Sequence, residues 1–156
     1  MEKIASFQVD HDTLEPGLYV SRIDEYNGMK TVTFDIRMKK PNDGDYLTTT
    51  EAHSIEHLGA TYLRNNADIK DRVVYFGPMG CRTGFYVIFF DDISVKEASV
   101  IITDMFEFIA SYEGEIPGAK AKECGNYLDL ELGCAKTQAK EYLEVLHRLC
   151  YENTHY

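Results

Sequence analysis

Two kinds of hydrophobic periodicity divide the chain into predicted strands and helices. Residues 18–23 and 30–38 are rich in β-branched and aromatic side chains, and in the second stretch apolar positions alternate with polar ones. This alternation is typical of a strand with one buried face. The pair Asn27-Gly28 between the two stretches is the strongest short-range signal for a hairpin. Two further strands are predicted at residues 72–76 and 85–90.

The remaining apolar stretches have the 3.6-residue periodicity of amphipathic helices. A helix is predicted over residues 48–67, and Thr48 with Glu51 has the spacing of a capping box at its start. Ser94 with Glu97 repeats this spacing before a second helix, and a last helix runs from about residue 134 to 151. The order β-β-α-β-β-α-α predicts an α+β fold, in which helices pack against a mainly antiparallel four-stranded sheet. A chain of 156 residues suits one domain, spanning 1–156.

Composition excludes some classes of partner. A net charge of -10 argues against nucleic acid, because neutralising phosphates requires clustered Lys and Arg. The chain has no apolar run long enough to span a bilayer and no secretion signal, so we expect a cytoplasmic protein that does not bind membranes. The cysteines have no C-x-x-C spacing, which leaves reduced thiols for chemistry or metal binding: Cys81, Cys124, Cys134 and Cys150.

The predicted helix at 48–67 carries the sequence His-Ser-Ile-Glu-His at residues 53–57. Positions three and four apart share one helix face, so His53, Glu56 and His57 project from the same side. Two histidines four residues apart can supply two ligands of a tetrahedral metal, with the glutamate close enough to move protons. The order is that of the inverted zinc helix, H-x-x-E-H. The alternative is a chance pattern of ordinary surface or core histidines.

A metal site needs a third ligand, and Cys124 is the best candidate because it lies in a glycine-containing turn. Its alternative role is that of a small buried apolar residue. Two imidazoles and a thiolate would leave one position open, as in catalytic sites. Cys81 lies in a glycine-rich connector next to Arg82, and a nearby guanidinium would favour the basic, nucleophilic thiolate. A buried inert thiol is the alternative for Cys81.

Three motifs, in their order along the chain, resemble those of S-ribosylhomocysteine lyases, the bacterial LuxS family. They are His-Ser-Ile-Glu-His-Leu at 53–58, Gly-Pro-Met-Gly-Cys-Arg-Thr-Gly-Phe-Tyr at 77–86 and Glu-Cys-Gly-Asn-Tyr at 123–127. Ser6-Phe7, His11 and the stretch 33–37 agree as well, so the resemblance covers nearly the whole chain. It implies a homodimer with active sites at the subunit interface, and a divalent metal that is iron(II) naturally and zinc in many purified samples.

Residue roles follow from the resemblance by position. It implies that His53, His57 and Cys124 are metal ligands, and that Cys81 and Glu56 form the acid–base pair. It also implies that Ser6, His11 and Arg37 reach the ribose and the catalytic thiol from the partner subunit, and that Arg64 helps hold the homocysteine end of the substrate. Many members carry an acidic residue six positions before the catalytic cysteine, where this chain has Tyr75. This departure leaves open how the substrate ammonium is held.

The family reaction converts S-ribosylhomocysteine to homocysteine and 4,5-dihydroxy-2,3-pentanedione, the precursor of a quorum-sensing signal. The carbonyl must first move along the ribose to carbon 3, so that the proton at carbon 4 becomes acidic and the sulfur at carbon 5 leaves by β-elimination. A Lewis-acid metal with an open position would stabilise the developing negative charge. We expect Cys81 to transfer protons during isomerisation. We expect Glu56 to transfer hydroxyl protons and to assist the later elimination.

Two other functions are compatible with the motif at residues 53–57. Metallopeptidases also carry H-x-x-E-H, with the glutamate activating a zinc-bound water. The second thiol and the short chain argue against that function. A zinc-stabilised binding module would require four protein ligands and a metal that is needed for folding. The predicted central helix has its own capping box and apolar stripe, so we expect the fold to survive metal loss.

Overall fold

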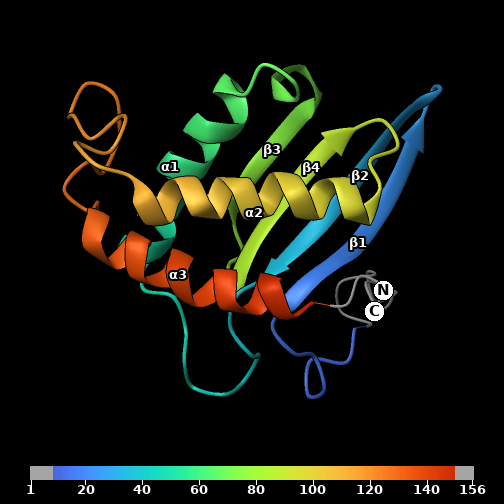
Figure 1. The fold of residues 1–156 in the computed structure, drawn as a ribbon, viewed down its shortest axis with the longest axis horizontal. Helices are drawn as coiled ribbons and strands as arrows, with labels where there is room; N and C mark the ends of the chain where they lie inside the picture. The colour runs from blue at the N-terminus through green and yellow to red at the C-terminus, as the bar shows by residue number, and fades with distance from the viewer. Residues whose placement is uncertain (1–8, 150–156) are drawn as a thin grey trace.

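A four-stranded sheet forms the framework of the fold (Figure 1). The structure is a computed structural model, and it describes residues 9–149. The strand order is β1-β2-β4-β3, and each neighbouring pair is antiparallel. The predicted antiparallel four-stranded sheet is therefore confirmed. The strands are β1 (Gly17–Tyr26), β2 (Met29–Arg37), β3 (Val73–Pro78) and β4 (Gly84–Phe90).

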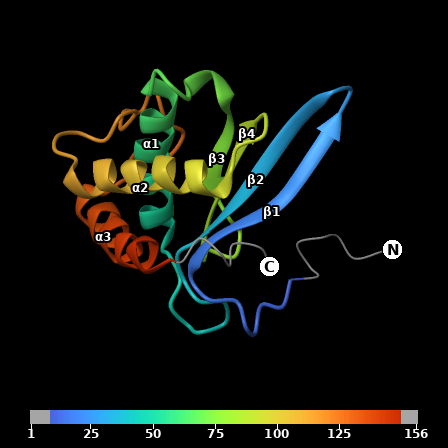
Figure 2. The ribbon, with the colours of Figure 1, turned by 45° about the vertical axis from the view of Figure 1, so that its right-hand side comes forward.

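The predicted hairpin joins β1 and β2. Tyr26 pairs with Met29 across the turn, so Asn27 and Gly28 are its two central residues. Both have positive φ, at 50° and 77°, which a two-residue hairpin turn of this kind requires. Figure 2 shows the hairpin extending past the helices. β1 ends later and β2 begins earlier than the sequence predicted, because the two strands stay paired up to this turn.

Three α-helices of the described chain lie on one face of the sheet (Figures 1 and 2). The side chains of Phe34 and Ile36 on β2 are fully buried in the core that also includes the helices. Phe106 and Tyr142 meet edge to face in this core, with ring centroids 4.8 Å apart. The α+β fold is therefore confirmed. The helices are α1 (Thr49–Asn65), α2 (Val95–Ser111) and α3 (Leu132–Arg148), and a short 3-10 helix, η2 (Lys70–Arg72), precedes β3.

The N-termini of α1 and α2 have the caps that the sequence predicted. Thr48 Oγ1 accepts a hydrogen bond from the Glu51 N–H at 3.2 Å, and the Glu51 carboxylate accepts from the Thr48 N–H at 2.7 Å. This is a complete capping box. At α2 the Ser94 hydroxyl oxygen accepts from the Glu97 N–H at 3.1 Å. The start of α1, four residues before His53, is thus fixed by local sequence.

The start of α3 differs from the prediction by two residues. Glu131 is its N-cap, and the carboxylate accepts hydrogen bonds from the N–H groups of Gly133 and Cys134. These bonds lower the pKa of Glu131. Glutamate is an uncommon N-cap, which explains why the sequence did not show it. Burial raises the pKa of the Cys134 thiol to about 12, with Glu131 adding to the effect.

No helix within residues 9–149 is long and apolar enough to cross a membrane. Cys150 and Ser6, both named from the sequence, lie outside the described residues.

Candidate metal centre

His53, His57 and Cys124 come together beside α1. One possible ligand atom from each lies within 4.8 Å of the others. The two imidazole centroids are 4.7 Å apart, and Cys124 Sγ is 3.3 Å from His53 Nε2. All three side chains are half-buried. The structure therefore places the cysteine against the histidine helix, as the predicted metal site requires.

Both imidazoles are oriented by backbone carbonyls. His53 Nδ1 lies 3.0 Å from the Asp129 carbonyl oxygen, and His57 Nδ1 lies 2.7 Å from the Pro117 carbonyl oxygen. A carbonyl only accepts hydrogen bonds, so each Nδ1 carries a proton, and in the neutral imidazole Nε2 then keeps its lone pair. This is the tautomer that a metal ligand needs, with the second-sphere acceptor that such ligands commonly have. The donor set fits a bound metal.

The loop between α2 and α3 is fixed onto α1. Gly118 has φ 79°, and a Cβ at this position would lie only 3.0 Å from His57 Nδ1. Glycine therefore allows the loop to pack against this imidazole. Further along, the Asp129 carboxylate accepts a hydrogen bond from the Thr50 hydroxyl, and the Glu131 N–H donates to Ser54 Oγ at 2.9 Å. The loop that carries Cys124 is thus attached to α1 at several points.

We expect Asp129→Ala to weaken metal binding about tenfold, because it removes the carboxylate that attaches the loop to Thr50. Competition against a chelator of known affinity measures this change. Asp68→Ala is the matched control, since Asp68 is exposed and lies outside this loop. Equal metal affinity of the two variants would show that the contact does not support the centre.

A cavity of about 550 Å³ adjoins the three candidate ligands. Glu56 lines it, so the carboxylate faces the same space as His53 and His57, as their shared helix face predicts. Thr61 and Glu123 add further polar groups. A ligand in this cavity would meet both the candidate metal centre and an acid–base group.

Cys81 lies in a second cavity, of about 330 Å³, which His11 and Tyr46 also line. The thiol is exposed, so the sequence alternative of a buried inert thiol is wrong. The turn around Cys81 depends on Gly84, where an added Cβ would lie 2.0 Å from the Ile36 carbonyl oxygen. Within the described chain, Cys81 and Glu56 line separate cavities.

The guanidinium beside Cys81 belongs to Arg37. Its Nη1 is 3.9 Å from Cys81 Sγ, whereas Arg82 donates to the Leu47 carbonyl oxygen at 3.3 Å. The sequence pointed to Arg82 because it is adjacent in the chain. The structure selects Arg37 because β2 pairs with β4 in a register that sets Arg37 opposite Gly84. Arg37 therefore contacts the thiol of its own chain. Its reach toward a partner subunit stays a prediction.

Other predicted site residues are placed as follows. Arg64 donates to the carbonyl oxygens of Val73 and Val74, at 2.6 and 3.0 Å, and so connects α1 to β3. Its substrate contact stays a prediction. Tyr75 is exposed on β3.

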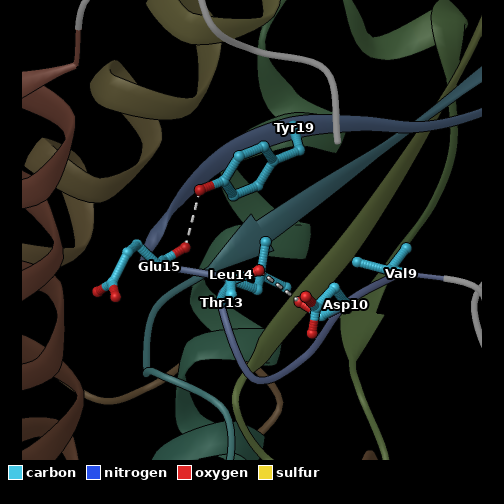
Figure 3. A pocket seen from close by; sticks show the side chains of 6 residues that line it. All are labelled: Val9, Asp10, Thr13, Leu14, Glu15 and Tyr19. Atoms are coloured by element: carbon cyan, nitrogen blue, oxygen red, sulfur yellow. Dashed lines mark hydrogen bonds between the residues drawn. The ribbon is translucent and has the colours of Figure 1, made fainter.

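The segment that carries His11 lies before the start of β1, around a third cavity of about 270 Å³ (Figure 3). The Tyr19 hydroxyl donates to the Glu15 carbonyl oxygen at 2.9 Å. Burial, and then Asp35 and Glu15, raise the pKa of Tyr19. None of the predicted site residues lines this cavity.

Fold and site together define a class: a small α+β protein with an open candidate metal centre of two imidazoles and one thiol, and a second thiol held beside a guanidinium. The family described as S-Ribosylhomocysteinase (LuxS) matches residues 4–152. The chain belongs to this family. The resemblance drawn from its three motifs is thereby confirmed.

Curated relatives match along their whole length. Proteins named S-ribosylhomocysteine lyase are 50% identical in Clostridium beijerinckii and 48% identical in Clostridium acetobutylicum. A protein of the same name in Borreliella burgdorferi is 46% identical. Each match covers 100% of this chain and 99% of the relative.

Proposed function

We propose that the cavity beside His53, His57 and Cys124 is where this chain cleaves S-ribosylhomocysteine. The chain is a carbon–sulfur lyase, and its products are homocysteine and 4,5-dihydroxy-2,3-pentanedione, the autoinducer precursor. The observation that supports this site is the meeting of three ligand atoms within 4.8 Å, next to the Glu56 carboxylate. Purified protein should release homocysteine from S-ribosylhomocysteine and should leave casein intact, whereas a metallopeptidase would do the reverse.

The proposed centre holds one divalent metal per subunit. Two imidazoles and a thiolate suit iron(II) or zinc and are unsuited to magnesium or calcium, which prefer oxygen ligands. We assign iron(II) as the native metal and zinc as a substitute. When bound, the metal would act as a Lewis acid toward oxygen atoms of the ribose.

The acid–base work falls to two residues with different surroundings. We propose that Cys81 Sγ takes and returns the protons bound to the ribose carbons. Glu56, which lines the metal cavity, moves hydroxyl protons and assists departure of the thioether sulfur. Two bases at separate positions suit a reaction in which protons leave different atoms.

We further propose that a homodimer completes the active site. His11 and Cys81 line one cavity of the chain, with Arg37 beside the Cys81 thiol, and the metal centre with Glu56 lines another. A second copy would bring the thiol cavity of one subunit to the metal cavity of its partner. Exposed apolar side chains on the strands supply surface that such a copy can cover: Ile23, Tyr26, Met29 and Phe90.

Mixing two inactive variants tests this shared site. Equal amounts of Cys81→Ala and Glu56→Gln, unfolded together and refolded, give hybrid dimers in about half of the population. Each hybrid has one site with both native residues, so activity should return to about a quarter of the wild-type level. Each variant refolded alone is the control. A mixture as inactive as its components would contradict a site shared between subunits.

A further inference from the structure

The Cys81 thiol lies at the end of a series of polar contacts that starts at a buried carboxylate. On β2, Asp35 and Arg37 form an ion pair, and the two residues are 0% and 2% exposed. Arg37 Nη1 donates to Thr83 Oγ1 at 2.5 Å. Thr83 Oγ1 is in turn 3.0 Å from Cys81 Sγ. The hydroxyl of Thr83 is therefore the polar group between the guanidinium and the thiol.

The direction of the hydrogen bond between Thr83 and Cys81 follows from the chemistry of arginine. A guanidinium has donors only, so the Thr83 oxygen must accept the bond from Arg37. The hydroxyl proton is then free to point elsewhere, and the Cys81 sulfur is within reach. We propose that the Thr83 hydroxyl donates a hydrogen bond to Cys81 Sγ. Thr83 is then a positioning residue for this sulfur. This inference rests on the proposed role of Cys81 as proton carrier.

The backbone around Thr83 holds this hydroxyl in place. The Thr83 carbonyl oxygen accepts from the N–H groups of both Met38 and Lys39, each at 2.9 Å. These bonds attach the turn to the end of β2, where Arg37 lies. The Thr83 side chain is 2% exposed, so water competes little for its hydroxyl. The position of the Thr83 hydroxyl is thus fixed by the backbone bonds that join this turn to the end of β2.

A hydroxyl donor changes the balance between the thiol and the thiolate. A hydrogen bond to an ionised acceptor is stronger than one to the neutral form, so the Thr83 proton favours the thiolate. Arg37 Nη1 lies 3.9 Å from the same sulfur. Other titratable or charged groups face the thiol from the elements around it: His11 of the N-terminal segment, Tyr46 of the loop before α1, Arg82 of the same turn and Tyr86 of β4.

Alkylation of Cys81 across pH tests the proposal without substrate. Metal-loaded Thr83→Val keeps the shape of the side chain and loses the donor. The midpoint of its alkylation profile should lie about one pH unit above that of the wild-type protein. Thr83→Ser restores the hydroxyl and should return the midpoint to the wild-type value. Mass spectrometry of the Cys81 peptide separates its modification from that of other cysteines.

A control variant and an independent measurement on the wild-type protein complete the test. Thr137→Val makes the same exchange at an exposed position on α3 and should leave the profile unchanged. In the wild-type protein, the Thr83 hydroxyl proton should exchange slowly with water by NMR and should shift when Cys81 is alkylated, a measurement that needs no variant to fold. Superimposable profiles of Thr83→Val and the wild-type protein, or a rapidly exchanging hydroxyl, would overturn the proposal. Lyase activity enters neither measurement, so the proposed function is tested separately.

Discussion

Replacing Cys81 by alanine should lower the rate of homocysteine release by about 10²–10⁴-fold, which is the usual contribution of an acid–base group. The sulfur is the only atom lost that can carry a proton. The metal should stay bound at the wild-type level, because Cys81 lines a cavity separate from that of His53, His57 and Cys124. A colorimetric thiol assay and metal analysis of one sample measure both quantities.

Cys134→Ala is the matched control for this substitution. Cys134 lies at the start of α3 and lines neither the thiol cavity nor the metal cavity. Its alanine variant should turn over at the wild-type rate. Release of homocysteine by Cys81→Ala at the rate of Cys134→Ala would disprove the assignment of Cys81 as the proton carrier.

Replacing Cys124 by alanine should weaken metal binding by more than about 100-fold and reduce turnover in parallel, because the centre loses one of its three ligands. The fold should persist, since α1 has its own capping box and the loop keeps its other attachments to that helix. Metal analysis after dialysis, together with thermal unfolding by circular dichroism, separates loss of metal from loss of structure.

The spectrum of the cobalt-substituted protein gives an independent measure of the Cys124 ligand. Wild-type protein should show a sulfur-to-cobalt charge-transfer band, and Cys124→Ala should lack it. Cys81→Ala should keep the band, because its thiol is outside the centre. A band that persists in Cys124→Ala and disappears in Cys81→Ala would reverse the roles of the two thiols.

Local patterns in the sequence were sufficient for most of the fold. The Asn27-Gly28 turn, the capping box at Thr48 and the apolar stripe of α2 each depend on residues close in the chain, and each is present. The start of α3 was missed because its N-cap is Glu131, a residue type that is uncommon at this position. The sequence predicted β1 and β2 as too short at their hairpin ends. Pairing with a neighbouring strand, and not side-chain type, determines where a strand stops.

The candidate site was only partly predictable, because some of its contacts arise from tertiary structure. The pair His53 and His57 follows from helix periodicity alone, and their carbonyl partners at Pro117 and Asp129 do not, since backbone acceptors leave no trace in residue type. The contact between Arg37 and Cys81 depends on the register of β2 against β4, which neither strand encodes by itself. The sequence therefore pointed to Arg82 as the guanidinium beside Cys81, because the two residues are adjacent in the chain.

Cleavage of S-ribosylhomocysteine should depend on the metal held by His53, His57 and Cys124. The most direct test is to strip the protein with a chelator, add back iron(II) anaerobically in steps, and measure bound metal and homocysteine release in each sample. Activity should rise in proportion to bound metal and level off at one ion per subunit. Turnover by metal-free protein, or a plateau reached equally by Cys124→Ala at the same iron concentrations, would contradict the account.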